Sequence, residues 1–181
     1  MTLREITKEK LTQILKRHLA WLNDEPNGER ADLRSADLSY ANLRYADLSY
    51  ADLRSANLSS ADLRSADLSY ANLRYADLSY ADLRSANLSS ANLSSADLSS
   101  ADLRSADLRS ANLDFSSGFS FRCSSFGAKI DIRLGAQLAY HFCRMDTDDE
   151  DVKAAQQAIK DLANKFHRVK ECGEIPCPSQ I

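Results

Sequence analysis

A five-residue period runs through the middle of the chain and limits the folds that it can adopt. From Ala31 to Ala111 every fifth residue is Ala, and a Leu stands two places after each of them, which makes seventeen uninterrupted repeats. On an α-helix, a step of five residues turns by about 140° beyond a full turn, so the leucines would wind around the axis. On a flat strand, an odd step would put successive leucines on opposite faces. Neither element can bury them together.

The period is compatible with burial if the chain turns a corner once in every repeat. Ala and Leu then always face inward, and the other three residues face outward. The chain contains only 5 Gly and 3 Pro, so the corners need another explanation. Short Asp and Asn side chains can bond nearby backbone donors and support tight turns. One of them precedes every Leu of the repeats, and we expect it to replace glycine at the corners.

The motif Ala-(Asp/Asn)-Leu-Xaa-Xaa over 31–113 resembles the pentapeptide-repeat family, and its seventeen copies make the resemblance specific. The resemblance implies an all-β solenoid, a right-handed quadrilateral β-helix in which four repeats make a coil of about 20 residues. The residues themselves predict one corner per repeat, whereas the number of corners per coil and the handedness come from the resemblance. We expect the β-helix to span 29–130, with a regular part at 31–113 and an irregular last coil at 114–130.

The segment 1–28 is predicted to be an N-terminal α-helical cap. Thr7 or the Thr2-x-x-Glu5 box is a possible start signal, and Asn27-Gly28 is the expected stop. The helix should lie across the first coil, because an open coil end exposes unpaired backbone groups. The apolar residues expected on its inner face are Leu11, Ile14, Leu15, Leu19 and Leu22.

The segment 131–181 is predicted to be a C-terminal α-helical cap with a loose tail. A short strand at 130–132 and a helix over 134–145 come first. A capping box at Thr147 and Glu150 should open a second helix that ends at Cys172-Gly173, with its acidic first turn opposing the helix dipole. The inward residues expected are Leu134, Leu138, Phe142 and Met145 in the first helix, and Val152, Ala155, Ile159, Leu162, Ala163 and Phe166 in the second.

The outward side chains form columns, because at about twenty residues per coil, residues twenty apart share a face. Stacked like charges repel, but aspartates at the turns can screen them, and exposed ion pairs are worth about 1 kcal/mol or less. We therefore expect a solvated surface. The columns are Arg44, Arg64, Arg84 and Arg104; Arg34, Arg54 and Arg74; Tyr40 with Tyr80; and Tyr50 with Tyr70.

Composition and charge argue against several classes of partner. The formal net charge is -3, so the chain lacks the basic surface that phosphate-backbone binding needs, and no nucleic-acid partner is expected. No apolar run of about 18 residues is present, and the charged N-terminal segment is unlike a secretory signal. The 4 cysteines are irregularly placed, as free thiols are. We expect a soluble, cytoplasmic monomer without a membrane partner.

The sequence offers no catalytic site. Serine is abundant because it fills outward repeat positions, no Gly-x-Ser-x-Gly motif occurs, and the three histidines lie in the expected caps. A zinc site is the strongest metal candidate, but a single cysteine pair in a loose tail favours free thiols. We predict no catalytic, cofactor-binding or metal-binding residues and no cofactor. The zinc ligands considered are His167, Cys172 and Cys177 with Cys143 or His141.

The repeats are unusually uniform. Residues 61–90 repeat the thirty letters of 31–60 without a change, and all seventeen inward alanines and leucines are identical. Members of the family vary these positions, so the uniformity indicates a synthetic consensus; recent amplification of a natural array is the alternative. The leading hypothesis is a structural scaffold with no catalytic activity and no ligand, made to test which residues specify the β-helix.

Two other functions remain open. Some pentapeptide-repeat proteins imitate duplex DNA and bind DNA gyrase, and the resemblance extends this possibility to the present chain. Duplex DNA carries one charge per about 1.7 Å, so a tower of about 20 Å would need about twelve negative charges. Residues 31–114 hold twelve Asp and eight Arg, a net charge of -4. The other alternative is a protein-interaction module that uses the Tyr and Arg columns, although tyrosines one or two coils apart form no contiguous patch.

Overall fold

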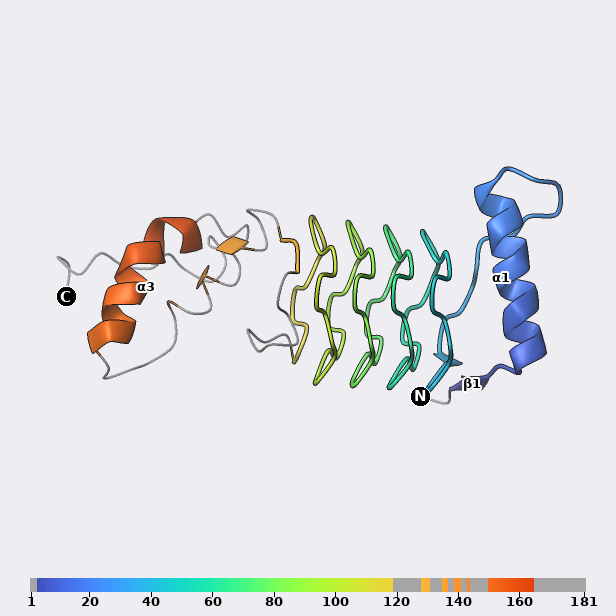
Figure 1. The fold of residues 1–181 in the computed structure, drawn as a ribbon, viewed down its shortest axis with the longest axis horizontal. Coiled ribbons are helices and arrows are strands. Elements are labelled where there is room, and N and C mark those ends of the chain that lie inside the picture. The colour runs from blue at the N-terminus through green and yellow to red at the C-terminus, as the bar shows by residue number, and fades with distance from the viewer. Residues whose placement is uncertain are drawn as a thin grey trace. The chain divides into compact units, whose positions relative to one another are not determined.

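The computed structural model describes residues 3–118, 128–130, 135–136, 139–140, 143 and 150–164. It divides into two compact units, Met1–Lys129 and Ile130–Ile181. The first contains strand β1 (Arg4–Glu5), helix α1 (Lys8–Leu22), strand β2 (Ala36–Asp37) and a stack of coils, and the second contains helix α3 (Glu150–Ala163) (Figure 1). Within the described residues, no helix has the length and apolar content needed to cross a bilayer.

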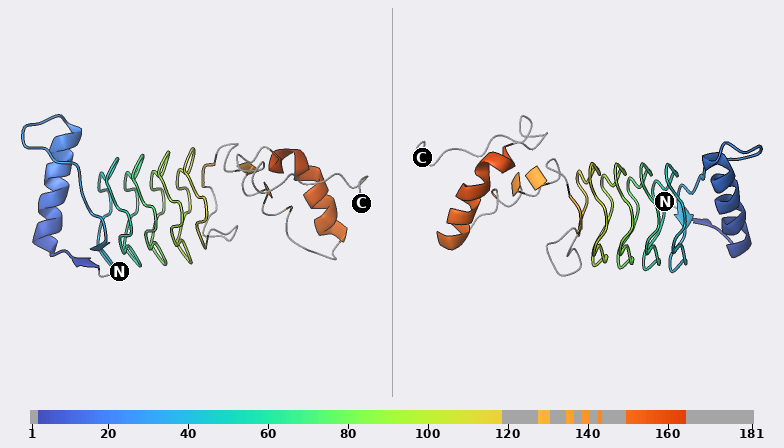
Figure 2. Two further views of the ribbon diagram at one scale, coloured as in Figure 1. Left: turned by 180° about the vertical axis from the view of Figure 1, so that it is seen from behind. Right: turned by 45° about the horizontal axis from the view of Figure 1, so that its top comes forward.

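The coils form a tower, residues 31–118, in which each coil is twenty residues long. Residues twenty positions apart pair as parallel bridges, from Asp32 with Asp52 to Asp97 with Ser117. The coils lie side by side in every view (Figures 1 and 2). Four repeats therefore make one coil, as expected. At the last bridge the spacing lengthens to twenty-two residues, between Asp107 and Lys129, and most of the expected irregular coil 114–130 lies outside the described residues.

Every backbone N–H group of a typical repeat has a partner, as the repeat 81–85 shows. The Ala amide donates to the Leu carbonyl three residues earlier, the Asp amide donates to the preceding coil, and the Leu and Ser amides donate to the following coil. The fourth amide, that of Arg84, donates to Oδ1 of Asp82 at 3.3 Å. All seventeen repeats make this last bond. The Asp or Asn side chain thus satisfies the one amide of the repeat that donates to no backbone carbonyl.

The corners are made by the fifth residue of each repeat. In all seventeen repeats this residue has a positive φ, between 52° and 62°, although it is Ser, Tyr or Phe and never Gly. It is the third residue of a turn that the Ala amide closes, where a type II turn also requires a positive φ. The Asp or Asn at the second position of each repeat therefore supports the corner, as predicted. The corner itself is formed by the left-handed fifth residue, for which no backbone role was predicted.

The core consists of the repeated aliphatic pair. All seventeen leucines from Leu33 to Leu113 are buried, with exposed fractions of 0% to 4%. Fifteen of the seventeen alanines are buried as well. The exceptions are Ala41 and Ala46, which are half-buried in the first coil. No coil precedes them, whereas Ala31 bonds His18 of α1 and Ala36 pairs with β1. The prediction that Ala and Leu face inward is thus confirmed.

Helix α1 begins at one of the two predicted start signals and ends earlier than predicted. Thr7 is the N-cap, and its hydroxyl accepts a hydrogen bond from the Lys10 amide at 3.2 Å. The helix ends at Leu22 instead of at Asn27-Gly28, because the chain turns sharply after it. Gly28 packs so closely against α1 that an added Cβ would come within 2.4 Å of the Trp21 nitrogen.

The inner face of α1 differs from the predicted face by one position. Leu11, Ile14, Leu15 and Leu22 are half-buried, but Leu19 is 51% exposed. The fully buried residue of the helix is His18, whose exposed fraction is 0%. The expected placement of Leu19 is wrong, because a polar contact between His18 and the first coil sets the rotation of the helix.

The unit Ile130–Ile181 has a small core of its own. Ala136, Ala139, Tyr140 and Ala163 are buried, and Cys143 and Ile159 pack against them. Helix α3 starts at Glu150 and ends at Ala163, well before the predicted end at Cys172. Ala155 is exposed, in contrast to its predicted inward position. Several residues of the predicted cap lie outside the described residues: Leu134, Leu138, Phe142, Met145, Thr147 and Phe166.

Leu73→Asp is expected to lower the free energy of unfolding by more than about 3 kcal/mol, because it combines the loss of a buried side chain with an unpaired buried carboxylate. Leu73 is fully buried near the middle of the tower. Asn72→Asp is the matched control, since it places the same carboxylate one residue earlier, at an outward position. Urea unfolding followed by circular dichroism measures both, and equal stabilities would contradict the inward orientation of Leu73.

Ser85→Val is expected to lower the free energy of unfolding by about 1–2 kcal/mol, because a branched Cβ crowds a left-handed backbone. Ser85 has φ of 57° and an exposed side chain, so the effect would arise in the backbone and not in packing. Ser85→Gly should stay within about 0.5 kcal/mol of the wild type, since relief of strain offsets the added chain entropy. The same urea titration tests the pair, and a Val variant as stable as the Gly variant would refute the corner assignment.

Candidate interaction surface

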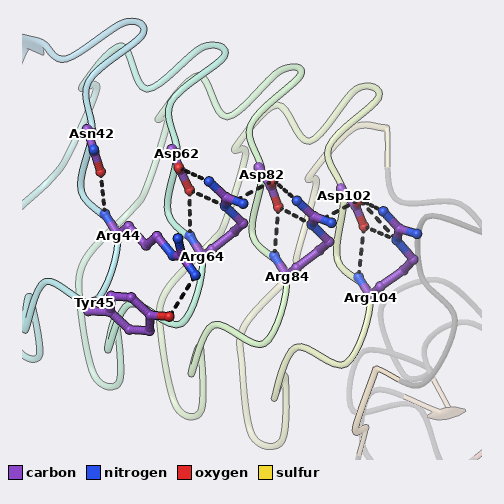
Figure 3. Close-up of polar contacts among 9 residues, drawn as sticks. All are labelled: Asn42, Arg44, Tyr45, Asp62, Arg64, Asp82, Arg84, Asp102 and Arg104. Atoms are coloured by element: carbon purple, nitrogen blue, oxygen red, sulfur yellow. Dashed lines mark hydrogen bonds and ion pairs between the residues drawn. The ribbon is translucent and has the colours of Figure 1, made fainter.

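In the column that begins at Arg44, the arginines from Arg64 to Arg104 and their aspartates form an alternating ladder of charges and not a stripe of like charges (Figure 3). Arg84 shows the geometry, with Nε donating to Oδ1 of Asp82 at 2.8 Å and Nη2 donating to Oδ2 at 2.6 Å. Its Nε also lies 3.7 Å from Oδ2 of Asp102 in the next coil. Arg64 makes the same two kinds of contact, and Arg104 pairs with Asp102. Asp82 and Asp102 thus each lie between two guanidinium groups.

The ladder changes the acidity of its aspartates. The hydrogen-bonded Arg64 guanidinium lowers the pKa of Asp62 to about 2. Arg104 likewise lowers the pKa of Asp102, against a smaller opposing effect of burial. The same contacts raise the pKa of Arg64 and Arg84. Both members of each pair are therefore ionised at neutral pH and largely neutralise each other.

The column of Arg34, Arg54 and Arg74 shows the same pairing of arginine with aspartate in its first two coils. Arg34 and Arg54 each bond the aspartate two residues earlier, and Arg34 Nε also lies 3.8 Å from Oδ2 of Asp52. Arg74 breaks the pattern, because residue 72 is Asn and offers no carboxylate. The expected columns of arginine are thus present, but the charges of all their members except Arg44 and Arg74 are paired with aspartates.

Where Asn replaces Asp, the arginine turns to a tyrosine. Arg44 and Arg74 each donate from Nη2 to the hydroxyl of the following tyrosine, Tyr45 or Tyr75, at 2.7 Å. Each guanidinium carbon also lies 4.6 Å from the ring centroid, within the range of a cation–π contact. These pairs were not predicted, although the motif Asn-Leu-Arg-Tyr at 42–45 and 72–75 distinguishes them from the other repeats.

One aromatic column is continuous. The rings of Tyr50 and Tyr70 stack with centroids 4.8 Å apart, and Trp21 of α1 meets the Tyr50 ring at 6.4 Å in an edge-on contact. Tyr50 and Tyr70 remain 45% and 56% exposed. The expectation that tyrosines on neighbouring coils stay separate is therefore wrong for this pair, because the spacing between coils brings two rings of one column into stacking distance.

Four of the tower serines take part in the hydrogen bonding of the corners. The hydroxyls of Ser39, Ser49, Ser59 and Ser89 donate to the Asp or Asn side chain of their own repeat at 2.7–2.8 Å. Of the histidines, only His18 lies within the described residues, and its ring bonds a backbone amide. No nucleophile–base pair therefore arises in this part of the chain.

The zinc candidates fall mainly outside the described residues, where His141, His167, Cys172 and Cys177 all lie. Cys143 is described as a free thiol whose Sγ bonds the Gln156 carbonyl at 3.3 Å, and burial raises its pKa. In the described ranges, His, Cys, Asp and Glu side chains nowhere gather in a group of three that could hold a metal ion.

Comparison with known proteins identifies the class to which this fold belongs. A family model described as pentapeptide repeats matches residues 31–69, 46–84, 66–104 and 76–114. The structure of alr5209, a pentapeptide repeat protein from Nostoc PCC 7120, is 30% identical, with a TM-score of 0.50 over 72% of this chain and 99% of that one. The chain belongs to the pentapeptide-repeat family, whose members form right-handed quadrilateral β-helices. No match was found among curated proteins.

Two further structures share the repeat. HetL, a pentapeptide repeat protein involved in heterocyst differentiation regulation from Nostoc sp. strain PCC 7120, is 38% identical over 57% of this chain, with a TM-score of 0.37. The present chain spans only 44% of HetL. QnrB1, a plasmid-mediated fluoroquinolone resistance protein, is 22% identical, with a TM-score of 0.29 over 65% of this chain and 72% of that one.

Asp62→Asn tests the charge ladder, because it keeps the Oδ1 acceptor for the Arg64 amide and removes the charge. The pKa of Asp62 falls from an ordinary 3.8 to about 2 in the folded protein, so its ion pair contributes stability above pH 3.8, and this contribution is lost as the pH falls through about 2. The variant should be less stable than the wild type at pH 7 by less than about 1 kcal/mol, since the pair is partly exposed to solvent.

The difference in unfolding free energy between the two proteins should shrink as the pH is lowered and vanish near pH 2. Asp77→Asn is the control, because the fourth residue of its repeat is Ser79 and not an arginine. A wild-type advantage over Asp62→Asn that stayed constant from pH 7 to pH 2 would contradict the ionic character of the ladder.

Proposed function

We propose that the chain is a non-catalytic structural scaffold, a synthetic consensus of pentapeptide repeats placed between two end segments and made to test which residues specify the β-helix. The observation that carries this proposal is the engagement of its outward side chains. In the tower, Asp and Asn brace the corners, arginines pair with aspartates or tyrosines, and several serines bond the Asx side chains. Few polar groups are left to converge on a ligand.

The uniform repeats support the synthetic origin. A duplication copies a segment together with its irregularities, whereas all seventeen inward pairs here are Ala and Leu and the outward positions draw on very few residue types. The exact thirty-residue copy at 31–60 and 61–90 is consistent with a gene written from a consensus. Selection for a binding surface would instead have made some coils differ from the others.

The proposal includes a cytoplasmic monomer that binds neither nucleic acid nor membrane. The formal charge of -3 and the local pairing of the arginines support this view, because phosphate binding needs unpaired basic groups. The stacked tyrosines Tyr50 and Tyr70 favour an interaction module to a small degree, since exposed aromatic residues are frequent at binding hot spots. Two rings beside small polar serines are nevertheless a modest surface.

Gyrase binding is the alternative with the sharpest test. A DNA mimic needs unpaired carboxylates in excess, whereas here arginines neutralise five of the aspartates in the two columns: Asp32, Asp52, Asp62, Asp82 and Asp102. We expect the purified chain at micromolar concentration to leave supercoiling by DNA gyrase unchanged and to retain no stoichiometric partner from a bacterial lysate. Clear inhibition of supercoiling by the wild-type chain would overturn the scaffold proposal.

A more acidic variant is the matched control. Replacing Arg54, Arg64, Arg84 and Arg104 by Ser, the residue at this position in many sister repeats, removes four positive charges without altering the core. If this variant inhibited gyrase while the wild type did not, the paired arginines would be what prevents mimicry. A retained partner that depended on Tyr50 and Tyr70 would instead support the interaction module.

A further inference from the structure

His18 joins helix α1 to the first coil through a bond that the repeat pattern cannot supply. In a typical repeat, the Ala amide donates to the Leu carbonyl of the preceding repeat. Ala31 opens the first repeat, so no such Leu precedes it. Its amide donates instead to Nδ1 of His18 at 3.1 Å, and the imidazole is fully buried. The histidine thus replaces a missing repeat at the end of the tower.

This hydrogen bond requires a neutral imidazole. Nδ1 must be unprotonated to accept the Ala31 amide, so the single ring proton is on Nε2. Nε2 is buried and makes no hydrogen bond of good geometry, while the ring stacks on Trp21 with centroids 5.7 Å apart. An imidazolium carries a proton on both nitrogens, so the Ala31 amide and Nδ1–H would face each other as two donors.

We propose that His18 is an acid-sensitive latch, whose protonation at Nδ1 releases helix α1 from the first coil while the rest of the tower stays folded. Release would uncover the Ala31 amide and the coil edge beside it, which are the groups that an end cap protects. This inference concerns a conformational change and goes beyond the scaffold function proposed above.

The groups around His18 set the pH range of the release. Burial is the largest effect and lowers its pKa below 6.5; Arg30 adds to this, whereas the Ser49 backbone and the Asp47 carboxylate of the first coil oppose it. A docked His18 therefore binds a proton less readily than a released one. Docking is favoured above pH 6.5, and the ratio of docked to released helix falls about tenfold per pH unit below 6.5, until the lower pKa of the docked state is reached.

The tower itself responds at lower pH. Its arginine-paired aspartates have a lowered pKa, about 2 for Asp32 and for Asp62. Between pH 6.5 and the ordinary aspartate value of 3.8, the charge ladder thus stays ionised while His18 gains a proton in the released state. The two transitions are separated by enough pH to be measured independently.

Amide hydrogen exchange followed by NMR tests the latch in the full chain. Between pH 7.5 and pH 5.0, the protection factor of the Ala31 amide should fall by about tenfold or more, while that of Leu73, inside the tower, stays constant. Fluorescence of Trp21, the only tryptophan, should change over the same range. An Ala31 amide that keeps its protection while the His18 ring titrates would overturn the proposal.

His18→Asn is the matched variant, because the amide oxygen of Asn can accept the Ala31 N–H and does not titrate. Its Ala31 protection and Trp21 fluorescence should not change between pH 7.5 and pH 5.0, although His141 and His167 are still present. A pH response of the same size in His18→Asn would exclude His18 as the latch. If the variant fails to dock at neutral pH, the contrast between Ala31 and Leu73 in the wild type decides the question.

Discussion

The tower depends on the complete use of its backbone amides at every corner. In a typical repeat, the amides of the first, second, third and fifth residues donate to backbone carbonyls. The amide of the fourth residue donates to the Asp or Asn side chain two residues earlier. This bond holds the chain as it enters a corner whose next residue is left-handed and is not glycine. Unpaired buried amides would cost free energy at each of seventeen corners, which explains why the Asx position varies only between two residues that share the same acceptor.

The same Asx position also determines the chemistry of the surface. Where it is Asp, the following arginine folds back onto the carboxylate and contacts the next coil, as Arg84 does. Where it is Asn, the arginine instead lies over a tyrosine, as Arg74 does. The Asp that supports the corner thereby neutralises the outward arginine, and this coupling is the physical basis of the scaffold function that we propose.

The hydrogen bonding and burial of the typical repeat are incomplete in the first coil. Ala41 and Ala46 are only half-buried, with no coil preceding them, and Ala31 has no preceding corner to accept its amide. The buried imidazole of His18 accepts the Ala31 amide instead, and this makes docking of α1 dependent on the protonation state of His18. The part of the molecule that differs from the repeats is therefore where a response to pH above the range of the aspartates can arise.

The sequence alone determined the inward Ala and Leu and the corner in each repeat, because these depend on period and on local hydrogen bonding. It offered Thr7 as one of two possible starts of α1. Family resemblance supplied the four repeats in each coil. Only the tertiary structure decided that the fifth residue is left-handed, since Ser and Tyr have no such local preference and hydrogen bonds between coils impose it. It also decided that His18 and not Leu19 faces the tower. The rotation of α1 follows from the hydrogen bond between the Ala31 amide and His18, and the spacing of hydrophobic residues carries no information about that bond.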